Sequence, residues 1–174
     1  MIKQPVINAI NQQINAEIYS SYLYLSMRAY FESINLKGFS HWMYIQTQEE
    51  MIHSLKFYNF LIERGGKVLL GEIAAPKVEW NSPLAVLEDV YAHELKVTEM
   101  INNLVNLAIS ESDHASNAFL QWYVTEQVEE ESSALDVLQK LKLIGDNPGA
   151  LFLLDAELAK RIIGPNTILQ IPLI

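Results

Sequence analysis

Apolar side chains recur at three-, four- and seven-residue steps along most of this chain. That spacing is typical of amphipathic helices and not of strands, in which apolar positions alternate. Glycine, proline and helix-capping residues divide the pattern into five stretches. We therefore predict helices over about residues 5–33, 38–64, 83–110, 113–144 and 148–163.

The stretch from about residue 66 to residue 81 has no helical pattern. About 16 residues is long for a connection within a compact domain. Fully extended it reaches ~50 Å, whereas a helix of ~28 residues is ~42 Å long, so it can run the whole length of a bundle. We predict an all-α fold, a four-helix bundle of two antiparallel hairpins joined by this long crossover, with a short fifth helix. A single domain, residues 1–174, would hold the bundle (about 5–144), the fifth helix (about 148–163) and an apolar tail (164–174).

Each of the four long helices carries an apolar stripe that acidic or amide side chains interrupt near its middle. The stripes are Ile10, Ile14, Glu17, Tyr24 and Phe31; Met43, Glu50, His53, Phe57 and Leu61; Leu87, Tyr91, Glu94, Ile101 and Leu104; and Phe119, Tyr123, Gln127, Glu130, Ala134 and Leu141. At ~1.5 Å of rise per residue, the four glutamates all fall ~18–25 Å along a ~42 Å bundle. We expect them to meet in the middle of the core.

Glu50 and His53 are three residues apart and therefore share one helix face. Alone, such a pair is as readily explained by two solvated surface residues as by a metal site. Four glutamates that converge in a core, with no Lys or Arg in their stripes, would repel one another and lose hydration. Two divalent cations would balance four carboxylates, and carboxylate oxygens with one imidazole suit ferrous iron. The sequence thus predicts a buried centre for two iron ions.

Composition narrows the range of partners. The chain has 174 residues, half of them hydrophobic, and a net charge of −9. An acidic surface without a Lys/Arg run argues against nucleic acid and anionic membranes and favours cations. No stretch approaches the ~20 apolar residues of a membrane span, and the N-terminus lacks a signal-peptide pattern. Cysteine is absent, which suits a reducing cytosol, so we expect a cytoplasmic protein.

These motifs together resemble a known family. Glu17 followed by Tyr24, Glu50-x-x-His53, Glu94 and Gln127-x-x-Glu130 are similar to the ferroxidase centre of ferritins. Residues 119–127 (FLQWYVTEQ) resemble the fourth helix of bacterial non-haem ferritins, and the likeness extends over about residues 5–160. It implies a ferritin-like bundle, a cage of 24 subunits, oxidation of Fe(II) to Fe(III) by oxygen or peroxide, and storage of ferric oxyhydroxide. The fourth helix lacks the second Glu-x-x-His of bacterioferritins, so haem is not expected.

The resemblance also implies roles for individual residues. One iron would be held by Glu17, Glu50 and His53, with Glu50 bridging to a second iron on Glu94 and Glu130 and with Gln127 close by. A third iron site would use Glu49, Glu126 and Glu129 and share Glu130. Tyr24 would hydrogen-bond a ligand carboxylate and donate an electron during oxygen reduction, and Trp122 would support it. 

Several other interpretations stay open. The acidic run 126–131 is also typical of a solvated face, and Tyr24 could be ordinary core packing. We interpret His41, His93 and His114 as surface or subunit-contact residues. At the level of function, a diiron oxidase or oxygenase acting on an organic substrate and a catalytically silent cage protein are the competing hypotheses. The apolar tail after Gly164 departs from the family pattern and leaves the pore near the fifth helix open to question.

Overall fold

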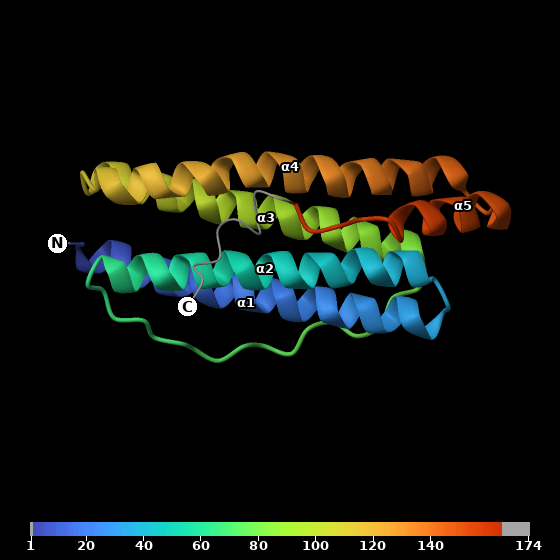
Figure 1. The fold of residues 1–174 in the computed structure, drawn as a ribbon, viewed down its shortest axis with the longest axis horizontal. Helices are drawn as coiled ribbons and strands as arrows, with labels where there is room; N and C mark the ends of the chain where they lie inside the picture. Colours follow the sequence, from blue (N-terminus) through green and yellow to red (C-terminus); the bar gives the residue numbers. More distant parts are fainter. Residues whose placement is uncertain (1, 165–174) are drawn as a thin grey trace.

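The computed structural model describes residues 2–164, and these residues form five helices. Their bounds are α1 Gln4–Ser33, α2 Lys37–Glu63, α3 Pro83–Ser110, α4 His114–Ile144 and α5 Pro148–Leu158. The first four lie side by side as a long bundle, and α5 continues from one end of it (Figure 1). The predicted all-α bundle with a short fifth helix is confirmed. The predicted apolar tail lies outside the described residues beyond Gly164.

The bundle consists of two helix hairpins. Helix α1 packs along α2, helix α3 packs along α4, and α1 also contacts α3. The connection between α2 and α3 has no helix and runs lengthwise past the bundle, as the crossover prediction requires (Figure 1). No helix among residues 2–164 combines the length and apolar character needed to cross a membrane.

Local sequence explains where the long helices begin and end. The Ser82 side chain accepts a hydrogen bond from the backbone N–H of Ala85 at the start of α3, and Asp113 does the same for Ser116 at the start of α4. Gly65, with φ of 74°, follows α2 in the left-handed conformation that glycine adopts easily. These positions are the ones that the sequence pattern marks as boundaries.

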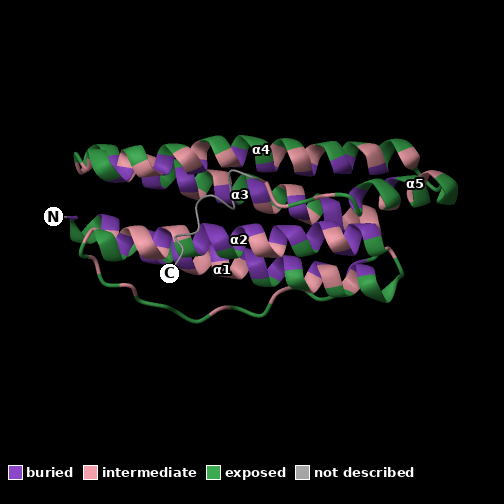
Figure 2. Cartoon of the chain, viewed as in Figure 1, coloured by how far each residue is buried: buried purple, intermediate pink, exposed green. Residues whose placement is uncertain are grey.

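Buried residues recur along each of the four long helices (Figure 2). They form two apolar clusters, one of which includes Phe31, Met43 and Leu87 and the other Ile10, Phe57 and Ile101. On each helix the two clusters are separated by buried polar residues, namely Glu17, Glu50, His53, Glu94, Gln127 and Glu130. The core is therefore apolar at both ends and polar in the middle.

Helix α5 docks against the start of α2. Asp155 Oδ1 accepts hydrogen bonds from the backbone N–H groups of Gly38 (2.8 Å) and Phe39 (3.0 Å). Helix α5 ends at Leu158, earlier than the predicted end near residue 163. After the helix, Arg161 and Gly164 form hydrogen bonds with the side chain of Glu49 on α2, and these contacts favour a non-helical path for the chain.

Candidate metal centre

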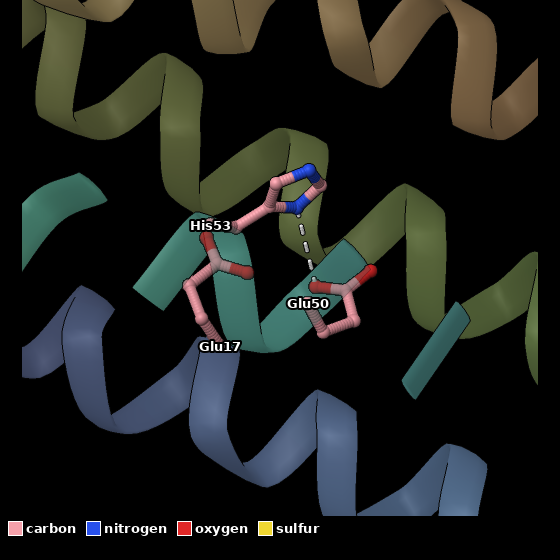
Figure 3. Close-up of side chains that lie close together, drawn as sticks. All are labelled: Glu17, Glu50 and His53. Atoms are coloured by element: carbon pink, nitrogen blue, oxygen red, sulfur yellow. Dashed lines mark ion pairs between the residues drawn. The ribbon is translucent and has the colours of Figure 1, made fainter. Parts of the chain in front are cut away.

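Three predicted ligands meet in the first half of the centre. Glu17 comes from α1, while Glu50 and His53 come from adjacent turns of α2, and all three point toward one another (Figure 3). Each offers a ligand atom that lies within 4.8 Å of the other two. His53 Nδ1 is 3.5 Å from Glu50 Oε2. Their exposed fractions are 1% for Glu17, 2% for Glu50 and 1% for His53, so the group is sealed from water.

The other two predicted ligands come from the second hairpin. Glu94 of α3 and Glu130 of α4 are both buried. Glu94 Oε1 accepts a hydrogen bond from the Tyr24 hydroxyl, and Gln127 Nε2 lies 3.3 Å from Glu94 Oε2. His53, Glu126 and Glu130 form a second group whose ligand atoms lie within 4.8 Å of one another. His53 therefore belongs to both groups.

Burial raises the pKa values of three carboxyl groups at this centre. Desolvation raises the pKa of Glu17 well above its ordinary value, and the nearby charge of Glu50 adds to the effect. Desolvation also raises the pKa of Glu50 to about 7, against the lowering effect of His53. For Glu94, desolvation followed by the charge of Glu130 raises the pKa to about 8. Without a cation the cluster therefore holds protons near neutral pH, and a bound cation would replace them.

Burial alone acts on the pKa of His53 in the opposite direction. Desolvation lowers the pKa of its imidazole, but hydrogen bonding to Glu126 and Glu50 outweighs it, so the net pKa is well above the ordinary value. His53 Nε2 lies 3.8 Å from Glu126 Oε1. The backbone carbonyl of His53 accepts a hydrogen bond of 2.8 Å from the Tyr123 hydroxyl, which fixes this turn of α2. A metal ligand held this way needs little rearrangement on binding.

Two amide side chains outside the predicted site donate hydrogen bonds to its carboxylates. Gln13 Nε2 donates to Glu17 Oε1 at 2.8 Å, and Gln46 Nε2 donates to Glu130 Oε2 at 2.9 Å. Both glutamines are buried. Gln13 is four residues before Glu17, so helical spacing could have identified it. Gln46 reaches across to another helix, and no local spacing indicates that contact.

The residues expected at a third iron site do not form one buried group like that of Glu17, Glu50 and His53. Glu126 is partly buried beside His53, whereas Glu129 is exposed on α4. Glu49 is buried, but its Oε2 pairs with Arg161 Nη2 at 2.7 Å. Desolvation raises the pKa of Glu49 to about 7, with Arg161 acting in the lowering direction. Arg161 lies within the stretch predicted as the fifth helix but after the observed end of α5, and no sequence pattern indicates its contact with Glu49.

The remaining histidines lie away from the carboxylates. His93 is partly buried between α1 and α3, with Nε2 2.8 Å from Ser20 Oγ, instead of on the open surface. Burial lowers its pKa to about 4, and Lys96 adds to this. His41 Nε2 lies 2.8 Å from the carbonyl oxygen of Arg161. His114 is exposed at the start of α4.

Comparison with known proteins gives the family. Residues 7–144 match the ferritin-like domain of the family Ferritin. A bacterial non-heme ferritin from Bacteroides fragilis is 43% identical over 92% of this chain and 100% of its own, and one from Staphylococcus epidermidis is 37% identical over 92% and 97%. The solved open-pore ferritin of the hyperthermophilic archaeon Archaeoglobus fulgidus is 56% identical, covers 93% of this chain and 100% of its own, and superposes with a TM-score of 0.92. The chain belongs to the ferritin family.

Proposed function

We propose that this protein stores iron and acts as a ferroxidase, oxidising Fe(II) to Fe(III) at the buried cluster. One observation carries the proposal: Glu17, Glu50 and His53 place their ligand atoms within 4.8 Å of one another in the dry middle of the bundle. Within residues 2–164, no Lys or Arg forms an ion pair with Glu17, Glu50, Glu94 or Glu130. Buried carboxylates without a basic partner are stable when cations bind them.

Iron is the substrate of this reaction. Glu17, Glu50 and His53 would hold one ion, Glu50 would reach the second, and Glu94 and Glu130 would complete that second position. Two adjacent ferrous ions supply two electrons to one oxygen molecule, and the anionic ligands favour the ferric products. The number of ions, two at this centre with a third predicted on Glu49, Glu126, Glu129 and Glu130, is part of the proposal.

Neighbouring side chains have defined parts in this scheme. The Tyr24 hydroxyl donates to Glu94 and so orients a ligand carboxylate, which also places a redox-active phenol beside the ions. Gln127 donates to the same carboxylate and to the hydroxyl of Thr98 at 3.2 Å. The indole of Trp122 lies with its ring centroid 5.4 Å from that of His53. We assign Tyr24 and Gln127 to the chemistry through these contacts.

The remaining expectations extend the proposal beyond one subunit. We infer a cage of 24 copies, cytoplasmic and without haem, that deposits ferric oxyhydroxide inside. Relatives that are ferritins over their whole length support the cage. The oxygenase alternative fits less well, because Tyr24, Phe57 and Tyr123, each at most 1% exposed, fill the space around the ligands. The silent-cage alternative fits less well because all five principal ligands are buried at the centre.

The test is a Glu50→Ala, His53→Ala double variant mixed with Fe(II) in air. We expect ferric absorbance to appear much more slowly than with the unmodified protein, because both substitutions remove ligands from the cluster. Size-exclusion chromatography should show both proteins at about half a megadalton, as expected for 24 copies of a 19.8 kDa chain. Oxidation at an unchanged rate would reject the assigned centre, and a particle of a few subunits would reject the cage.

A further inference from the structure

The carboxylate of Glu49 is already neutralised by a residue from the far end of the described chain. Arg161 Nη2 lies 2.7 Å from Glu49 Oε2, and the backbone N–H of Gly164 donates to Glu49 Oε1 at 3.2 Å. The side chains are 5% exposed for Glu49 and 20% for Arg161. Protein donors thus occupy both oxygens of a buried carboxylate.

Several contacts hold the segment 159–164, which we call the return segment, along α2. The Arg161 guanidinium lies 4.5 Å from the ring centroid of Trp42, and the Arg161 carbonyl oxygen lies 2.8 Å from His41 Nε2. After α5 the chain turns back toward the middle of the bundle (Figure 1). From His41 to Glu49 these contacts extend over about two helical turns of α2. The position of Arg161 is therefore set by the backbone as well as by its own side chain.

Glu49 precedes the predicted ligand Glu50 on α2 and is four residues before His53, so Glu49 and His53 lie one turn apart on the same face of the helix. The charges of Glu130 and His53 both act on it. His53, Glu126 and Glu130 bring their ligand atoms within 4.8 Å of one another, so a cation at that group would lie against the face of α2 that also carries Glu49. A guanidinium and a divalent cation beside one carboxylate repel each other, and the repulsion is strong where little water screens it. An outer cation at Glu49 would therefore compete with Arg161 for that carboxylate.

We propose that Arg161 determines how many cations the centre binds. While the return segment is docked, Arg161 pairs with Glu49 and prevents it from binding a cation. The centre then binds only the two ions of the proposed ferroxidase site. An outer cation on Glu49, Glu126 and Glu130 binds when it displaces the guanidinium, and the return segment is then released from α2. The proposal rests on the proposed function, since it takes the buried cluster to be a metal site.

The test compares Arg161→Gln with Lys160→Gln in the full-length protein, using Zn(II), which binds without being oxidised. Lys160 is the adjacent cation and is exposed, so its variant changes the net charge equally and leaves Glu49 paired. Calorimetric titration and anomalous diffraction should show two tightly bound ions per subunit in the unmodified protein and in Lys160→Gln. Arg161→Gln should bind a third ion at Glu49, at least about tenfold more tightly than the other two proteins.

Hydrogen–deuterium exchange of the return segment provides a measurement on the unmodified protein. As Zn(II) is raised past two ions per subunit, the amide of Gly164 should exchange faster, because its acceptor on Glu49 is lost. A third ion at Glu49 with the return segment still protected would overturn the proposal, as would equal affinities in both variants. Absence of ions from Glu17, Glu50 and His53 in every protein would instead reject the proposed function.

Discussion

The carboxyl group of Glu94 has contacts that suit both its protonated and its ionised form. Its oxygens accept hydrogen bonds from Tyr24 and Gln127, which favour the ionised form. Burial and the charge of Glu130 act more strongly and raise its pKa to about 8. Such a group is protonated when no cation is present and ionised when one binds. Cation binding at this position is therefore an exchange of metal for protons.

The Glu94→Gln variant tests this at the residue scale. The folded pKa of about 8 exceeds the ordinary 4.5, so between these pH values the unfolded chain releases a proton that the folded chain keeps. The metal-free protein should thus lose stability as pH rises from 5 to 8, and Gln removes the part of this loss that Glu94 causes. We expect nearly equal melting temperatures at pH 5 and a variant that melts at least about 3 °C higher at pH 8.

Thermal unfolding in chelator, followed by circular dichroism, measures that difference. Glu99→Gln is the matched control, because Glu99 is an exposed glutamate on the same helix. Its melting temperature should follow the unmodified protein at both pH values. A gap between Glu94→Gln and the unmodified protein that does not grow with pH would contradict the raised pKa.

Helix α5 shows how one element depends on another. Helix α2 has no side-chain cap of its own at Leu36, and Asp155 of α5 supplies the missing acceptor to Gly38 and Phe39. A Cβ on Gly38 would lie 1.6 Å from the backbone oxygen of Asp155, so only glycine permits this approach. The cap joins two elements that are more than 100 residues apart in sequence.

The helices also show which structural features can be predicted from the sequence. Periodicity and capping residues were sufficient for α1 to α4, because both are local properties of the chain. They also place the principal glutamates and His53 on inward faces, although their metal-binding role stays a prediction. The predicted end of α5 near residue 163 was wrong, since Arg161 and Gly164 leave the helix to reach Glu49. That contact and the one between Gln46 and Glu130 depend on tertiary geometry, which spacing does not encode.

Replacing Asp155 by Ala tests the cap between elements. The loss of an acceptor for two backbone N–H groups should destabilise the protein by about 1 kcal/mol, which corresponds to about 2–4 °C in melting temperature. Hydrogen exchange at Gly38 and Phe39 should increase. Glu157→Ala is the control: it removes an acid from the same helix whose pairing with Lys140 is exposed and worth little. Equal exchange at Gly38 in the two variants would show that Asp155 does not cap α2.

The four-helix bundle consists of two hairpins, and the proposed metal centre lies between them. Glu17, Glu50 and His53 belong to the α1–α2 hairpin, whereas Glu94 and Glu130 belong to the α3–α4 hairpin. Within residues 2–164, the buried polar side chains include several glutamates but no Lys or Arg, and the net charge of the full sequence is −9. Cations at this position would offset the repulsion among the glutamates and connect the two hairpins. Metal binding should therefore stabilise the entire bundle and not only the residues that contact the ions.

Zinc binding gives the measurement at this scale. At a free Zn(II) concentration about 100 times its dissociation constant, linkage adds about 2.7 kcal/mol of stability, or about 5–10 °C in melting temperature. The increase in melting temperature should be smaller at pH 5.5 than at pH 7.5. The pKa values of Glu50 (about 7) and Glu94 (about 8) are raised, so at pH 5.5 both carboxyl groups carry protons that zinc must displace. The Glu50→Ala, His53→Ala protein should show almost no increase at either pH. An equal increase in that variant would place the stabilising cation elsewhere on this acidic chain, and the two hairpins would then be held together by apolar packing alone.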